Sequence, residues 1–200
     1  MPGTAALMLE REQDAALMNF RCRGCGNCCH LRIPVTHHDL QRIIEATGKK
    51  AEDIVEFVPT SEFRGIPDDL TWIRFGPRKK DLRVMCLQER DGHCMYLGDD
   101  CRCQGYAYRP VVCRTHPFIL ELDDDESGIT SIEHNDGCEC AGDDGHKFSE
   151  SELVDMHNWS TGEDTEYTGL VAIWNRNRKI RSEEEFLRYI AGRKLRPAGE

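Results

Sequence analysis

The sequence predicts an α+β fold, in the form of a small, irregular, cysteine-rich domain with short helices and small antiparallel hairpins. Three observations indicate it: helical periodicity with capping signals near both ends, alternating stretches in the middle that suit only hairpins, and cysteine- and glycine-rich segments between them. The chain has 200 residues, enough for one hydrophobic core. We therefore expect one compact unit.

The N-terminal part predicts an arm followed by two short helices. Residues 1–19 have a weakly helical composition and no pattern that would face a partner, so we expect a loosely held arm. Thr36, with Asp39 three residues on, is a capping signal, and Gly48 is a typical helix end. Residues 51–58 predict a second amphipathic helix of one or two turns.

The middle of the chain predicts two hairpins. Residues 71–87 alternate well enough for two strands joined by a loop over residues 76–81. Residues 117–134 predict a second hairpin with an acidic tip. The segment between them is broken by glycines and rich in cysteine, so we expect mostly loop there.

The C-terminal part predicts helices. Ser149, followed by a glutamate three residues on, is a capping box that begins one or two helices, and Ser182 caps a last one. We therefore divide the chain into the arm 1–19, a cysteine-cluster metal-binding domain over 20–145, and C-terminal helices over 146–200 packed on the same unit.

Composition and charge restrict the class of protein. The formal net charge of -10 argues against general binding to nucleic acid. No apolar run approaches the roughly 18 residues of a membrane-spanning helix, and the first twenty residues do not resemble a secretory signal. We expect a cytoplasmic protein with no nucleic-acid or membrane partner, in which a reducing environment leaves the thiols free for metal.

The charge is uneven along the chain. Residues 115–146 contain ten acidic and no Lys or Arg residues, whereas residues 174–197 contain eight basic and three acidic ones. Two solvated faces explain this pattern most simply. A protein partner that docks on the basic C-terminal helices is the sharper alternative.

The first cysteine cluster, FRCRGCGNCCH, is the strongest motif in the chain. Cys22, Cys25 and Cys28 follow one another at three-residue intervals, with glycines that allow tight turns. The spacing fits a zinc knuckle and also the run that binds an iron–sulfur cluster. Cys29 follows Cys28 directly, and because neighbouring side chains diverge, we expect two metal centres, one multi-iron cluster with a thiol beside it, or a strained vicinal disulfide.

More cysteines follow in two further groups. Cys113 falls in the first turn of a short helix predicted to begin at Pro110, where backbone dipoles favour the thiolate, and Arg109 and Arg114 flank it. The members of the second group are Cys86, Cys94, Cys101, Cys103 and Cys113; those of the third are Cys138 and Cys140.

These motifs resemble the YkgJ-type CxxCxxCC cysteine-cluster family, zinc- or iron-chelating domains related to flagellin lysine N-methylases. The likeness covers roughly residues 20–140 and includes the quadruple-cysteine motif and a Tyr, Arg-Pro, Cys-Arg, Pro-Phe string that runs from Tyr106 to Phe118. The resemblance implies eight metal ligands: Cys22, Cys25, Cys28, Cys29, Cys94, Cys103, Cys113 and Cys138. Cys86, Cys101 and Cys140 look additional, and Cys101 and Cys103 could exchange roles.

The predicted function is metal binding through clustered cysteines, with an iron–sulfur cluster or zinc as the cofactor. The alternative is an iron–sulfur enzyme, either an electron-transferring oxidoreductase or a lysine N-methylase-like transferase. The sequence contains no Gly-x-Gly-x-x-Gly turn after a strand and no Cys-x3-Cys-x2-Cys run that would support a transferase. His30 and His116 lie next to cysteines and could complete a coordination corner, although capping or solvation is the commoner role.

Overall fold

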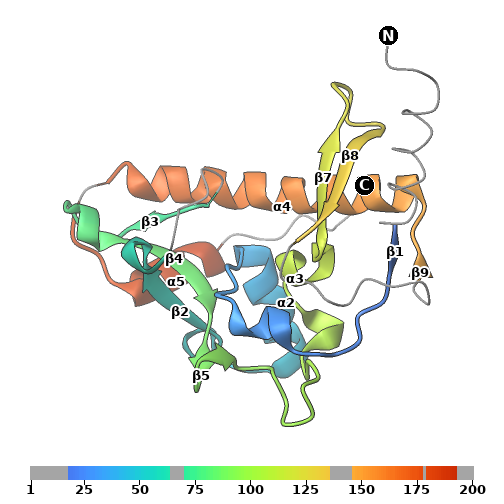
Figure 1. The fold of residues 1–200 in the computed structure, drawn as a ribbon. Helices are drawn as coiled ribbons and strands as arrows, with labels where there is room; N and C mark the ends of the chain where they lie inside the picture. The colour runs from blue at the N-terminus through green and yellow to red at the C-terminus, as the bar shows by residue number, and fades with distance from the viewer. Residues whose placement is uncertain (1–17, 64–69, 136–145, 178, 193–200) are drawn as a thin grey trace.

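A long helix, α4 (Glu150–Asn175), runs along one side of the molecule, and most other elements lie on one side of it (Figure 1). The structure is a computed structural model that describes residues 18–63, 70–135, 146–177 and 179–192. Four helices and several antiparallel sheets of two or three strands make up this part of the chain. The fold is α+β, as the sequence predicts.

The largest sheet is antiparallel and has the strand order β2–β4–β3. Its strands are β2 (Val55–Pro59), β4 (Leu82–Leu87) and β3 (Ile73–Arg74). The predicted hairpin over residues 71–87 is therefore confirmed. The second predicted helix is wrong: after a 3-10 turn, η2 (Ala51–Asp53), the chain becomes β2, because Val55 and Phe57 are strand formers that are buried while they pair with β4.

Three two-stranded pairs complete the β structure. The second predicted hairpin is confirmed as β7 (Phe118–Leu122) and β8 (Ile129–His134), which projects past α4 in Figure 1. The other two pairs are β1 (Asn19–Phe20) with β9 (His146–Lys147), and β5 (Glu89–Arg90) with β6 (His93–Cys94).

The helices begin at the predicted caps. In α2 (His37–Thr47), the Thr36 side chain accepts from the backbone N–H of Asp39, and Gly48 ends the helix at φ 66°. Ser149 and Ser182 form the same capping box at the start of α4 and of α5 (Glu183–Ala191). The short helix α3 (Val111–Thr115) follows Pro110, which lies at the N-cap rather than at the first helical position.

An aromatic core joins the sheet to the C-terminal helices. Phe186 is fully buried, and its ring centroid lies 5.1 Å from that of Trp174 and 5.8 Å from that of Phe57. The Trp174 indole N–H donates to the carbonyl of Arg74 at 2.9 Å. The helices α4 and α5 are thereby fixed to the edge strand β3.

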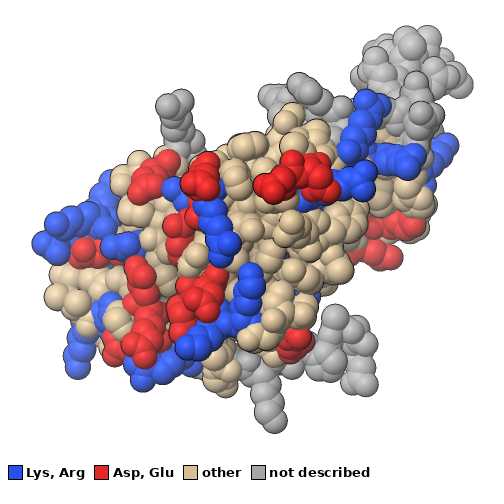
Figure 2. Space-filling model, turned by 90° about the horizontal axis from the view of Figure 1, so that it is seen from below, with Lys and Arg blue, Asp and Glu red and all other residues tan. Residues whose placement is uncertain are grey.

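Charged side chains of both signs are interspersed over the face drawn in Figure 2. Some charged side chains of the described residues form ion pairs, as Arg32 does with Glu56 and Glu89. Of the helices in the described ranges, none combines the length and the apolar character needed to cross a membrane.

Candidate metal centre

A left-handed turn at Gly26 presents the first cysteine pair. Gly26 has φ 78° and precedes η1 (Asn27–His30), whose start is fixed by a hydrogen bond from the Cys29 N–H to the Gly26 carbonyl at 2.8 Å. A Cβ at Gly26 would lie 3.0 Å from Leu97 and 3.3 Å from the Cys101 carbonyl. The first cysteine loop therefore lies directly against the second cysteine segment.

Five of the predicted ligands come together at one edge of the core. Cys29 and Cys94 belong to the buried core cluster, and Cys28, Cys103 and Cys113 pack against it. The ionisation of Cys113 is opposed by Cys28, Cys94 and Cys103, which shows that thiols far apart in sequence are close in space. The three segments that carry these cysteines therefore converge.

The adjacent thiols of Cys28 and Cys29 do not diverge as expected. The tight turns of η1 bring them together, and the Cys29 thiol donates a hydrogen bond to the Cys28 sulfur. This bond lowers the pKa of Cys28 to about 6 and raises the pKa of Cys29. One thiolate is therefore already favoured near neutral pH before any metal binds.

The other clustered thiols favour the neutral form. Burial, followed by the neighbouring thiols, raises the pKa of Cys113, and burial is also the main cause of the raised pKa of Cys94 and Cys103. From the sequence we expected the start of α3 to favour a Cys113 thiolate, but burial acts in the opposite direction and raises the pKa of this thiol.

Arg109 provides positive charge beside the cluster. It lowers the pKa of Cys28 and also acts to lower that of Cys103, and its guanidinium lies 4.2 Å from the centroid of the Tyr106 ring. Arg114 has a different role: its Nε donates to the Arg109 carbonyl at 2.9 Å and its Nη2 to the Ala107 carbonyl at 3.0 Å. Arg114 thus holds the turn that positions Arg109.

Two of the remaining predicted ligands are more peripheral than these five. Cys22 and Cys25 are exposed, and Cys22 opposes ionisation of Cys103. Cys22 and Arg109 line an open hollow of about 570 Å³ beside the cluster. Cys138 and Cys140 lie outside the described residues.

Two of the additional cysteines, Cys86 and Cys101, are not among the thiols that pack on the main core. Cys86 is fully buried in β4, in a small apolar cluster with Val58 and Val84. Cys101 is exposed at φ 61°, whereas Cys103 pairs with Leu97 and is packed on the core. Of these two alternatives, Cys103 is the one placed among the other thiols.

The chemistry of this donor set fits a thiophilic metal. Five sulfurs surround one edge of the core, and raised thiol pKa values are what a metal ion would reverse by supplying positive charge. In the described residues no three cysteine sulfurs lie within 4.8 Å of one another. A single tetrahedral zinc ion would hold its sulfurs about 3.8 Å apart, from its Zn–S distance of about 2.3 Å.

A second group of donors was not predicted from the sequence. One ligand atom from each of His37, His38 and Glu166 lies within 4.8 Å of the other two. The adjacent histidines at a helix start were a weak signal. Glu166, more than a hundred positions away, gave none.

Comparison with known proteins identifies one family. Residues 21–139 match the family model described as "CxxCxxCC: Putative zinc- or iron-chelating domain". Neither the curated proteins nor the solved structures include a significant match. The matched region contains the first cysteine loop, the second cysteine group, Cys138 and every thiol of the cluster at the core edge, and the chain therefore belongs to the CxxCxxCC family of zinc- or iron-chelating domains.

Proposed function

We propose that this metal-binding protein holds an iron–sulfur cluster, with Cys28, Cys29, Cys94, Cys103 and Cys113 as the central ligands. The observation that carries the proposal is the convergence of these thiols from three distant segments. The further ligand candidates are the exposed Cys22 and Cys25, together with Cys138, which lies outside the described residues.

The spacing of the sulfurs supports a cluster over a single zinc ion. Among the described cysteines no three sulfurs are close enough for one tetrahedral ion, whereas a multi-iron cluster places its thiolates farther apart. A thiolate-bound cluster is also strongly negative, and Arg109 beside Cys28 and Cys103 offsets part of that charge.

Metal and sulfide analysis of protein purified without oxygen tests this proposal. We expect iron, acid-labile sulfide and visible absorption. A colourless protein with stoichiometric zinc and no sulfide would contradict it.

Substitutions then test which cysteines share the centre. Cys28→Ser and Cys113→Ser should each lower the content of the same metal, since both thiols lie in one group. Cys86→Ala is the matched control, because Cys86 is a buried cysteine outside that group. If Cys28→Ser and Cys113→Ser removed different metals, the cysteines would form independent sites.

The hollow beside the cluster favours a second candidate function, an iron–sulfur enzyme that is either an electron-transferring oxidoreductase or a lysine N-methylase-like transferase. Cys22 and Arg109 both line this hollow of about 570 Å³, so a small anionic molecule could approach the centre. Reversible reduction of the cluster, with a midpoint potential that shifts in Arg109→Gln, would favour electron transfer.

A protein partner at the basic C-terminal segment has less support. Arg181 lies over the Trp174 ring at 3.4 Å, and Arg188 pairs with Glu184, so part of the positive charge is engaged within the chain. The cytoplasmic location and the division into residues 1–19, 20–145 and 146–200 remain predictions from the sequence.

A further inference from the structure

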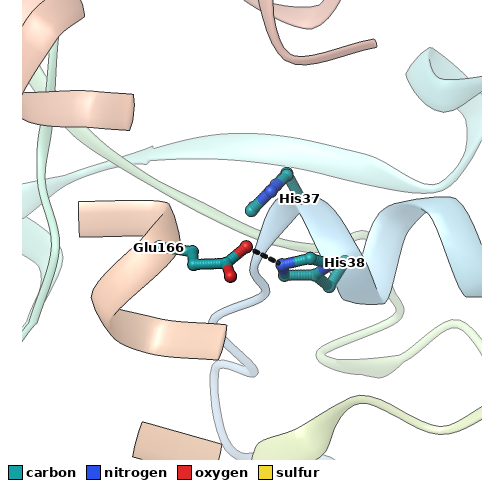
Figure 3. Close-up of side chains that lie close together, drawn as sticks. All are labelled: His37, His38 and Glu166. Atoms are coloured by element: carbon teal, nitrogen blue, oxygen red, sulfur yellow. Dashed lines mark hydrogen bonds and ion pairs between the residues drawn. The ribbon is translucent and has the colours of Figure 1, made fainter. Parts of the chain in front are cut away.

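The histidine and glutamate donors between α2 and α4 form a compact group (Figure 3). The rings of His37 and His38 have centroids 4.0 Å apart, and His38 Nε2 lies 3.0 Å from a carboxylate oxygen of Glu166. We propose that His37, His38 and Glu166 bind one divalent first-row transition-metal ion at a site separate from the cysteines.

The start of α2 fixes the two histidines. They are the first two residues of the helix, directly after the N-cap Thr36. The Thr36 backbone N–H donates to Asp39 at 2.9 Å, and the other carboxylate oxygen of Asp39 accepts from the Val111 N–H at 2.8 Å. The backbone that carries both rings is therefore held on both sides, which is the preorganisation a metal site needs.

A partly buried ion pair joins α2 to the segment of α4 that carries the glutamate. Arg42 of α2 forms a two-pronged pair with Glu163 of α4, with the second contact at 2.9 Å, and Glu166 lies three residues farther along the same helix. The Glu166 side chain is 48% exposed, whereas that of His38 is 9% exposed. The group is thus walled by protein on the histidine side and open on the carboxylate side, where an ion can enter and keep water ligands.

His37 is the third donor of the group, and the hydrogen bond between His38 and Glu166 does not account for it. Its residue is only 7% exposed, yet its Nδ1 is buried without a hydrogen-bond partner among the described residues. A bound ion would explain why the buried rings of His37 and His38 both lie close to the Glu166 carboxylate.

The donor set defines the class of ion. Two imidazoles and one carboxylate with an open side are the ligands of catalytic zinc and of non-haem iron(II) sites. No cysteine of the described residues belongs to this group, whose ligand atoms come from the start of α2 and from α4.

Cobalt(II) titration of the full chain, purified with its cysteine-bound metal in place, tests the proposal. We expect one additional cobalt equivalent, with weak ligand-field bands and without thiolate-to-cobalt charge transfer. Glu166→Gln and His38→Ala should weaken this binding by at least about 100-fold, because each removes a ligand. The matched controls on α4, Asp155→Asn and His157→Ala, should bind cobalt like the wild type.

Three results would overturn the proposal: no equivalent beyond the cysteine-bound metal, cobalt binding that persists in both ligand variants, or thiolate-to-cobalt charge transfer from the additional equivalent. Circular dichroism checks that each variant is folded. If His38→Ala misfolds, Glu166→Gln decides the outcome, because the Glu166 side chain is half-exposed and its substitution disturbs the fold less. Zinc and iron analysis of the wild type against Glu166→Gln identifies the resident ion. This comparison is independent of whether the cysteines hold iron–sulfur or zinc.

Discussion

Asp39 is the residue on which most of the local structure depends. It is fully buried, completes the capping box of α2, accepts from the Val111 N–H of α3 and pairs with Arg42. Burial raises its pKa while these partners act to lower it, so the carboxylate depends on them. The sequence predicted only the capping box, since nothing in it indicates the contact with Val111.

Asp39→Asn should lower the free energy of unfolding by about 1–3 kcal/mol, because an amide has one acceptor oxygen and the backbone N–H of either Thr36 or Val111 loses its buried partner. Urea unfolding of the metal-loaded protein measures the loss. Asp155→Asn, an exposed acid-to-amide change on α4, should stay within about 0.5 kcal/mol of the wild type. Equal stability of the two variants would contradict the role assigned to Asp39.

His37 predicts a particular pH dependence. Its pKa is lowered to about 4 in the folded protein from an ordinary 6.5, so between these values the unfolded chain binds a proton that the folded protein excludes. Stability should therefore rise with pH across this window and fall on acidification. Urea unfolding at several pH values should show a shallower dependence in His37→Gln than in the wild type; an unchanged slope would show that His37 does not titrate as described.

At the scale of elements, the cysteine loop depends on the left-handed turn before η1. Gly26→Ala should cost about 1–2 kcal/mol for the positive φ, with a further cost from contact with Leu97 and Cys101, and should lower the metal content. Gly48→Ala is the matched control: it has a similar φ of 66° but open space around it, so only the backbone cost applies. Equal metal content in both variants would contradict the close approach.

The elements themselves were largely predictable, because their signals are local. The three capping boxes and both hairpins follow from residues a few positions apart, such as Ser149 with Glu152. The helix predicted for residues 51–58 was wrong, because a short apolar stretch fits either a helix or a strand and only the pairing with β4 distinguishes them. The contact between the Cys28 and Cys29 thiols depends on 3-10 geometry that the spacing does not reveal.

At the scale of the whole molecule, the described chain is stabilised by the aromatic core around Phe186, and the metal that we propose at the core edge would be a second support. Removal of the metal by a chelator should lower stability substantially, since structural zinc contributes on the order of 10 kcal/mol in small domains. Hydrogen exchange should show lost protection in η1 and α3, which carry the cysteines, while β4 and α4 keep theirs. Uniform loss of protection would show that the two supports are not separable.

The sites differ in how much of them a sequence can reveal. Cysteine spacing identifies the metal-binding class, because few other uses require so many thiols in a short segment. Which thiols come together depends on how three segments pack, and a sequence does not show this packing. Among the described residues, the packing places Cys103 in the thiol group rather than Cys101, and it places Cys86 outside the group. The His37, His38 and Glu166 group depends on contact between two helices and has no local signature.

The double duty of Asp39 has one more consequence. A single carboxylate fixes the start of the helix that bears His37 and His38 and the start of the helix that bears Cys113. If both metals bind, filling one site that shifts this carboxylate changes the affinity of the other, and thermodynamic reciprocity requires an equal effect in the opposite direction. The affinities for the two ions would then be coupled through Asp39.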